Sequence, residues 1–298
     1  MRRRGYGVTA VLVLTTGCGT LPAADVGPPG SPAPGGTDRP DVVVTTGQPV
    51  TVLDDGDGPE ACLGAVMTSL PPQCGGTPLV GWEWADHDGQ YETQAGVRWG
   101  GFLLTGPFDG TRLTVAEAVP AASWTGTPPP PPTWDFSPPC PVPPGGWSTE
   151  RMPLFAEDVV FRAAEARPDY AGGWVDERES YDPPPGEPAA DAPEPQVLPP
   201  VVTIRVTGDP AAAEAELREV WDGPLCVTSA ERTEAELSAV QASLSEDLGD
   251  GLLLAASDVL TGTVEATVTF DDGTLQAALD ERHGEGVVRL TSALLPVG

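Results

Sequence analysis

Hydrophobic and polar positions in the last hundred residues alternate between two kinds of segment. Short runs rich in β-branched and apolar residues predict strands at 201–206, 225–228, 252–255, 264–270 and 287–290. Between them, apolar residues recur at helical spacing and predict helices over 209–221, 232–248 and from about 274 to 282. Asp209 is expected to cap the first of these helices, with Pro210 at its first position.

Upstream of this region, helical spacing predicts a further helix over 155–167, which stops before Pro168. A strand is expected at 170–175, and the Pro-, Glu- and Ala-rich residues 182–200 are expected to form an exposed loop. Strands mixed with helices over this length indicate an α+β two-layer sandwich spanning residues 150–298, with the helices on one face of a sheet.

Residues 42–126 have a different pattern, in which short apolar or alternating runs are separated by glycine-rich turns. Strands are predicted at 42–44, 49–53, 79–84, 97–104 and 112–115, the last of them following an Asp109-Gly110 hairpin signal. The pattern predicts a small antiparallel β-barrel or sandwich, and the five-stranded oligonucleotide/oligosaccharide-binding (OB) type is one candidate architecture.

Proline dominates residues 127–149, which include TPPPPPTW and SPPCPVPPGG. Because proline lacks a backbone donor and favours extended backbone, this segment is either a linker or a brace that lies across a surface. Cys140 lies within it and favours the brace. A polyproline ligand for a partner protein is a further alternative.

The N-terminus, MRRRGYGVTAVLVLTTGC, has arginines, then a short apolar run, then small residues before Cys18. This is the pattern of a secretory signal peptide, which is assigned to residues 1–17, and its apolar run is shorter than the roughly 20 residues of a spanning helix. Residues 14–18 also resemble a bacterial lipobox, although Thr15 replaces the usual aliphatic residue. Lipidation of Cys18 is therefore expected, with ordinary secretion as the alternative, and residues 18–41 are expected to be a disordered tether.

Charge excludes one class of partner. The chain has 298 residues with a formal net charge of −29, and every basic residue is arginine. Such a chain is repelled by nucleic acid and by anionic headgroups, because cationic side chains supply most of the affinity for phosphate. We therefore expect no nucleic-acid partner.

The other four cysteines, Cys62, Cys74, Cys140 and Cys226, form an even set in an exported protein. Export favours disulfides, and of the three possible pairings we favour Cys62 with Cys74 and Cys140 with Cys226. A metal site or a functional thiol is the alternative, but neither Cys62 nor Cys74 has the close Cys or His partner that zinc sites use.

Candidate binding chemistry is sparse. Trp82, Trp84 and Trp99 cluster in the β region, and the spacing of the first two would place both on one strand face. They are interpreted as core aromatics, with an exposed platform for glycan or peptide as the functional alternative. His87 and His283 lie beside turn glycines, with a metal or acid/base role as the alternative for His87.

The acidic stretch LDDGDGPE at 53–60 fails the EF-hand template and is interpreted as a turn, with a loose calcium site as the alternative. The sequence contains no GxSxG, Walker loop or HExxH motif, so it assigns no catalytic residue, metal or cofactor.

Four stretches resemble a group of exported proteins of unknown activity from GC-rich actinobacteria. They are CLGAVMTSLPPQCGGTPLVGWEW, ARPDYAGGWVD, VTGDPAAAEAELREVWDGPLCVTSAERTEAELSAVQ and GTLQAALDERHGEGVVRLTSALLPV. The resemblance covers about half of the mature chain and implies an envelope protein. It carries over no activity and no catalytic residue.

These features predict a protein anchored by lipid to the extracytoplasmic face of the cell membrane, or otherwise secreted. It would act as a cell-envelope binding or interaction module, with a cell-wall glycan or an envelope protein as its partner. The alternative is a secreted hydrolase whose catalytic residues are scattered along the chain.

Overall fold

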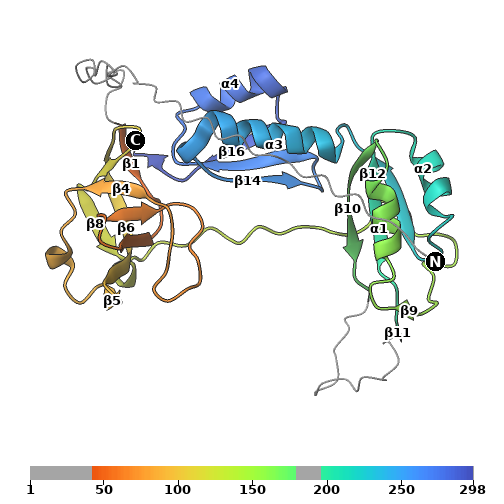
Figure 1. Cartoon of the computed structure of the whole chain (residues 1–298), viewed down its shortest axis with the longest axis horizontal. Helices are drawn as coiled ribbons and strands as arrows, with labels where there is room; N and C mark the ends of the chain where they lie inside the picture. The colour runs from red at the N-terminus through yellow and green to blue at the C-terminus, as the bar shows by residue number, and fades with distance from the viewer. Residues whose placement is uncertain (1–41, 179–195, 298) are drawn as a thin grey trace, which may run out of the picture. The chain divides into compact units, whose positions relative to one another are not determined.

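The computed structural model describes residues 42–178 and 196–297 (Figure 1). The predicted signal peptide, Cys18, the tether at 18–41 and most of the predicted loop at 182–200 lie outside the described residues. In the part that is described, no helix has both the length and the hydrophobicity needed to cross a bilayer. The fold class is the expected one, a β-barrel followed by helices and sheets.

The barrel is formed by short strands around one long strand. Its strands are β1 (Val42–Thr45), β2 (Val50–Asp54), β3 (Glu60–Cys62), β4 (Thr77–Val80), β5 (Glu92–Gln94), β6 (Val97–Phe108), β7 (Leu113–Thr114) and β8 (Glu117–Pro120). Strand β6 pairs with β2 and also with β7, and the path β2–β3–β4–β7 closes the ring between them. The expected pairing was antiparallel throughout, but β4 and β7 run parallel.

Close backbone approach explains a glycine in the long strand. A Cβ at Gly106 would lie 1.8 Å from the Thr114 carbonyl oxygen, where the chain after β7 crosses β6. No larger residue fits this position without moving the backbone. The barrel core is completed by fully buried apolar side chains, among them Val52, Phe102 and Leu104.

The barrel also takes a strand from the other end of the chain. Strand β17 (Leu295–Pro296) pairs antiparallel with β1, and Leu294 just before it is fully buried in the barrel core. The sequence pattern predicts these residues as part of the α+β domain at 150–298, whereas in the structure they pair with the barrel. The barrel therefore consists of residues 42–120 and the chain's last residues.

Two α/β units follow the Pro-rich segment. The middle unit contains β9 (Met152–Pro153), α1 (Asp158–Glu165), β10 (Tyr170–Asp176), β11 (Gln196–Val197), β12 (Val201–Val206), α2 (Pro210–Leu217) and β13 (Leu225–Ser229). The C-terminal unit contains α3 (Glu234–Leu248), β14 (Leu252–Asp258), β15 (Thr263–Val268), α4 (Thr274–His283) and β16 (Val288–Ser292). The remaining elements are short 3₁₀ turns, at Trp84–His87, Ala121–Ser123 and Gly249–Gly251.

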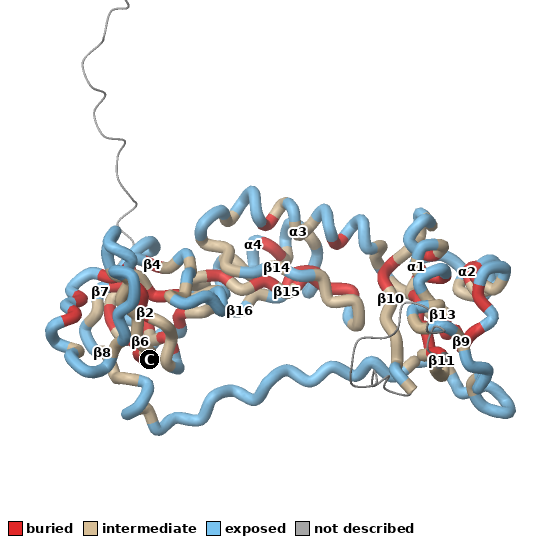
Figure 2. Tube along the Cα trace, turned by 60° about the horizontal axis from the view of Figure 1, so that its bottom comes forward, coloured by how far each residue is buried: buried red, intermediate tan, exposed pale blue. Residues whose placement is uncertain are grey.

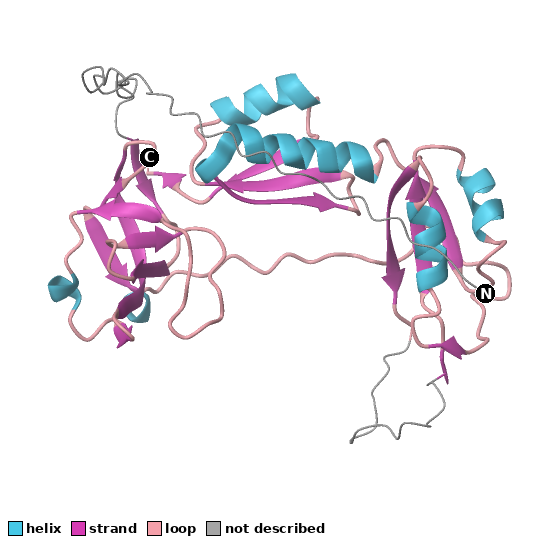
Figure 3. Ribbon diagram, in the orientation of Figure 1, coloured by secondary structure: helices cyan, strands magenta, loops and turns pink. Residues whose placement is uncertain are grey.

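The two units have the same topology. Leaving aside the small β9–β11 ribbon, each runs helix, strand, strand, helix, strand, and each has a three-stranded sheet. The central strand pairs antiparallel with the strand before it and parallel with the strand after it, so that Val202 faces Leu225 and Val264 faces Val288. Figure 3 shows both sheets with their helices.

Local signals in the sequence set the helix boundaries. The Asp209 carboxylate accepts a hydrogen bond from the Ala211 amide, and Pro210 is the first residue of α2, as predicted. Helix α3 begins with a capping box between Thr233 and Glu236, each side chain accepting from the other's backbone amide. Each helix pair packs on one sheet face, burying Val202, Ile204 and Val206 in the middle unit and Val264 and Ala266, equivalent to the first two, in the C-terminal unit.

The opposite face of the middle sheet is partly covered by the Pro-rich segment. Residues 125–137 are exposed to solvent, and the segment reaches the sheet at residues 136–140 (Figure 2). We call residues 134–141 the strap. The brace interpretation therefore applies to this part of the segment.

Candidate functional site

The tryptophans selected from the sequence lie mainly inside the barrel. Trp82 and Trp84 are 6% and 5% exposed, and their rings meet edge to face at 5.2 Å. They follow β4 rather than continuing it, so the predicted strand over 79–84 ends at Val80 and the one-face argument does not apply. Trp99 on β6 is half-buried. The interpretation as core aromatics holds for Trp82 and Trp84, which form no exposed platform.

The acidic turn after β2 is occupied by protein partners. Asp54, nearly buried, accepts hydrogen bonds from the Gly56 amide at 3.0 Å, the Trp84 indole at 2.9 Å and the Arg98 guanidinium at 2.7 Å. Burial raises the pKa of Asp54, but these hydrogen bonds and the Arg98 charge outweigh it and hold the pKa below its ordinary value. Asp54 is therefore a structural carboxylate that closes the turn.

No group of three or more His, Cys, Asp or Glu side chains that could hold a metal ion occurs within residues 42–178 and 196–297. The two histidines lie in different units. His87 stacks on Trp82 with the ring centroids 4.1 Å apart, and His283 is the last residue of α4, followed by Gly284 at the helix end as predicted.

Both predicted disulfides are present. Cys62, the last residue of β3, bonds to Cys74 and closes a short loop at the edge of the barrel, and Cys140 of the strap bonds to Cys226 of β13. Disulfides persist in oxidising compartments, so the pair indicates an extracytoplasmic environment.

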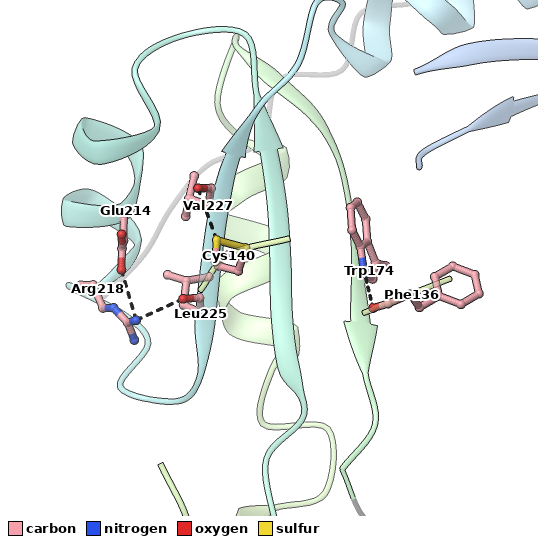
Figure 4. Close-up of a disulfide and its surroundings, with 8 residues drawn as sticks. Phe136, Cys140, Trp174, Glu214, Arg218, Leu225 and Val227 are labelled. Atoms are coloured by element: carbon pink, nitrogen blue, oxygen red, sulfur yellow. Dashed lines mark hydrogen bonds and ion pairs between the residues drawn. A yellow bond between two sulfur atoms is a disulfide. The ribbon is translucent and has the colours of Figure 1, made fainter. Parts of the chain in front are cut away.

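The strap is fixed to the middle sheet at two points (Figure 4). One is the Cys140–Cys226 disulfide, and the other is a 2.8 Å hydrogen bond from the Trp174 indole nitrogen to the Phe136 carbonyl oxygen. Trp174 and Cys226 lie on either side of Thr203 in the pairing register, so all three side chains share the face opposite the helices. The strap therefore crosses that face.

Beside these attachment points, the strap, the sheet and Leu260 of the turn after β14 line an open hollow of about 300 Å³. Asp135 and Ser137 of the strap line one side of it, and Trp174, Arg205, Thr228 and Ser229 line the sheet side. This volume is at the lower end of the range for small-molecule sites, and its lining is mostly polar. It is the candidate functional site.

Arg205 is held in a fixed orientation within this lining. Its Nη1 atom donates to the backbone carbonyl oxygens of Val259 at 2.7 Å and Leu260 at 3.0 Å, in the turn after β14. Arg205 has no carboxylate partner among residues 42–178 and 196–297, and its Nε and Nη2 donors have no partner there. Other arginines of this acidic chain, such as Arg98 and Arg167, form ion pairs.

The strap side of the hollow has a fixed carboxylate. Both the hydroxyl and the backbone amide of Ser137 donate to Asp135 Oδ1, the amide at 2.9 Å. These two hydrogen bonds, first the hydroxyl and then the amide, lower the pKa of Asp135, so that it is ionised at neutral pH. The hollow therefore contains an acceptor on the strap and a cationic donor on the sheet.

Side chains cover the outer edge of β13, the last strand of the same sheet. Arg218 forms an ion pair with Glu214 at 3.3 Å and donates to the outward Leu225 carbonyl oxygen of β13 at 3.4 Å (Figure 4). The Cys140 sulfur lies 3.9 Å from the next outward carbonyl oxygen, that of Val227. These side chains obstruct addition of a strand from another chain at this edge of the sheet.

Sequence reasoning missed the residues of this hollow. Trp174 and Arg205 lie in ordinary alternating strands, and only the predicted Cys140–Cys226 pairing indicated that the Pro-rich segment reaches their sheet. In the structure, Trp134 and Phe136 of the strap are 60% and 42% exposed next to Asp135 and Ser137, and large exposed aromatic side chains often mark contact surfaces.

Comparison with known proteins gives no further guidance: no known protein family matches this chain, and a search of curated proteins finds no significant match.

Proposed function

We propose that this protein is a lipid-anchored, extracytoplasmic binding module of the cell envelope. The observation that supports it best is the hollow under the strap, where a disulfide and an indole hydrogen bond hold polar side chains around a concave site. The lipid anchor is supported by the resemblance of residues 14–18 to a lipobox. Anchored in this way, the hollow would meet cell-wall glycans and envelope proteins.

Membrane attachment is tested by fractionating cells that express the wild type or Cys18→Ala. We expect the wild type in the membrane fraction and the detergent phase, and the variant in the soluble fraction. Formation of both disulfides in each protein, measured by thiol alkylation, serves as the control for export. Equal membrane association of the two exported proteins would overturn the anchor.

Binding through the strap-covered face is tested by photocrosslinking in cells. A photoreactive phenylalanine analogue replaces Trp134 beside the hollow or, as a matched control, Leu254 on the C-terminal unit, since both side chains are 60% exposed. We expect a discrete crosslinked envelope species from position 134 only. The same species from both positions, or none from position 134, would contradict binding at this face.

A further inference from the structure

We infer that the hollow under the strap binds a sugar acid, that is, a pyranose ring carrying a carboxylate. This inference rests on the proposed binding function and assigns a ligand class to its site. Three features of the hollow support it: a fixed guanidinium without an anion, an aromatic wall, and a set of hydroxyl and carboxylate groups.

The guanidinium of Arg205 provides the carboxylate-binding end. Its Nη1 atom is engaged by the carbonyl oxygens of Val259 and Leu260, which fixes the plane of the group. If Arg205 only held the Val259–Leu260 turn, the contacts of Nη1 would be explained. The Nε and Nη2 donors, which have no partner among the described residues, would not be. Arginine donors in this fork geometry match a carboxylate, and a preoriented fork loses little entropy when it binds.

Asp135 narrows the choice among anions. It lies on the opposite side of the hollow from Arg205 and accepts from Ser137, so it stays charged. Phosphate or another compact anion would be repelled by this carboxylate. A ligand with hydroxyl groups at one end and a carboxylate at the other can donate to Asp135 and accept from Arg205 at once.

The remaining lining suits a pyranose ring. Trp174 is held by its hydrogen bond to Phe136 and contributes an apolar ring surface to the sheet side of the hollow. The hydroxyl of Thr228, which shares the sheet face of Arg205 in the pairing register, has no side-chain hydrogen bond to any described residue and is free to bond to a ligand hydroxyl.

The test is calorimetric titration of the full-length protein, produced by export so that its disulfides form. The probes are glucuronic acid, N-acetylmuramic acid and, as a neutral control, glucose. We expect at least one of the acids to bind at least about 10-fold more tightly than glucose, as a charge-assisted hydrogen bond predicts. The two acids distinguish a ring carboxylate from a carboxylate on a side chain.

Variants locate the binding. Arg205→Gln should weaken binding of the acid about 10-fold or more and remove the preference over glucose. Because Arg205 also holds the Val259–Leu260 turn, Thr228→Val serves as a second variant that retains side-chain shape. It should weaken binding about 3- to 10-fold, whereas Thr291→Val, on the C-terminal unit, should leave it unchanged.

Absence of binding by either acid at millimolar concentration, or equal binding of glucose and the acids, would overturn the sugar-acid assignment. So would acid binding that is the same in wild type and Thr228→Val. If the titration fails while position 134 still yields a crosslinked envelope species, the binding function stands and only the ligand class is wrong.

Discussion

Leu294 tests whether the chain's last residues are part of the barrel. This side chain is fully buried in the barrel core, whereas its neighbour Leu295 in β17 is 45% exposed. Leu294→Ala removes carbon groups worth about 2.4 kcal/mol, at ~0.8 kcal/mol each, and leaves a cavity. The free energy of unfolding of the barrel should therefore fall by about 3–5 kcal/mol. Leu295→Ala, the matched control, should cost roughly 1 kcal/mol.

The measurement must distinguish the barrel from the other units, because a chain with several units need not unfold in one step. Amide hydrogen exchange does so. In Leu294→Ala, exchange at the barrel core amides of Val52 and Leu104 should accelerate roughly 100-fold or more, since every 1.4 kcal/mol is a factor of ten. Exchange at Leu244, in the C-terminal unit's core, should change much less.

Two results would refute this reasoning. If Leu294→Ala and Leu295→Ala had equal effects on barrel exchange, burial of Leu294 in that core would be wrong. If exchange at Leu244 accelerated as much as exchange in the barrel, the C-terminal residues would stabilise the C-terminal unit and not the barrel.

Two further predictions concern stability. Asp54 has a lowered pKa, so its contribution to stability should be present above its unfolded pKa of about 3.8 and lost as pH falls through its folded pKa. Asp54→Asn should lower the free energy of unfolding by about 1.5–3 kcal/mol at pH 7. The variant should also lose less stability than the wild type between pH 5 and 2, measured by urea unfolding at each pH. Replacing Cys140 and Cys226 by serine opens a separation of 86 residues and should cost the middle unit about 4.5 kcal/mol on the chain-entropy model. Replacing Cys62 and Cys74, at a separation of 12, should cost the barrel about 3 kcal/mol. Each loss is measured by amide hydrogen exchange within its own unit, and equal losses would contradict that model here.

Much of the second half of the fold could be predicted because its signals are local. The Asp209-Pro210 start of α2 and the run of β-branched residues in β12 each follow from residues close together in the chain. Gly284 likewise ends α4 by its positive φ of 99°, which glycine adopts readily. Such signals act in the unfolded chain and do not depend on tertiary contacts.

The barrel was predicted less well because its pairings are long-range. Strand β3 (Glu60–Cys62) has no strand-like composition, and β17 contains a proline; both are extended because they pair with a neighbouring strand. The region of Trp82 and Trp84 showed strand-like alternation but folds as a turn, because both rings enter the barrel core from it. Residue pattern alone does not distinguish these outcomes.

The candidate site could not be predicted from the sequence because its parts come from segments far apart in the chain. Asp135, Trp174, Arg205 and Thr228 are each ordinary in their local sequence, and they meet because the strap crosses the sheet. The Cys140–Cys226 pairing was the one long-range contact that the sequence indicated, and it locates the sheet but not the hollow.

The two α/β units differ in one feature that favours the middle sheet as the proposed binding surface. Both units protect the free edge of their last strand, but with different residues: Arg218 covers Leu225 of β13, while the Gln276 amide bonds to both the Val288 carbonyl and the Leu290 amide of β16. Protection of the same edge by unrelated side chains is expected when an unpaired strand edge is a liability in itself.

The faces opposite the helices differ instead. The C-terminal unit pairs Glu265 with Arg289 there, whereas the equivalent positions of the middle unit are Thr203 and the strap-bonded Cys226. The strap therefore adds a concave site to a unit that shares its topology with its neighbour, so a ligand-binding role should be sought in the middle unit.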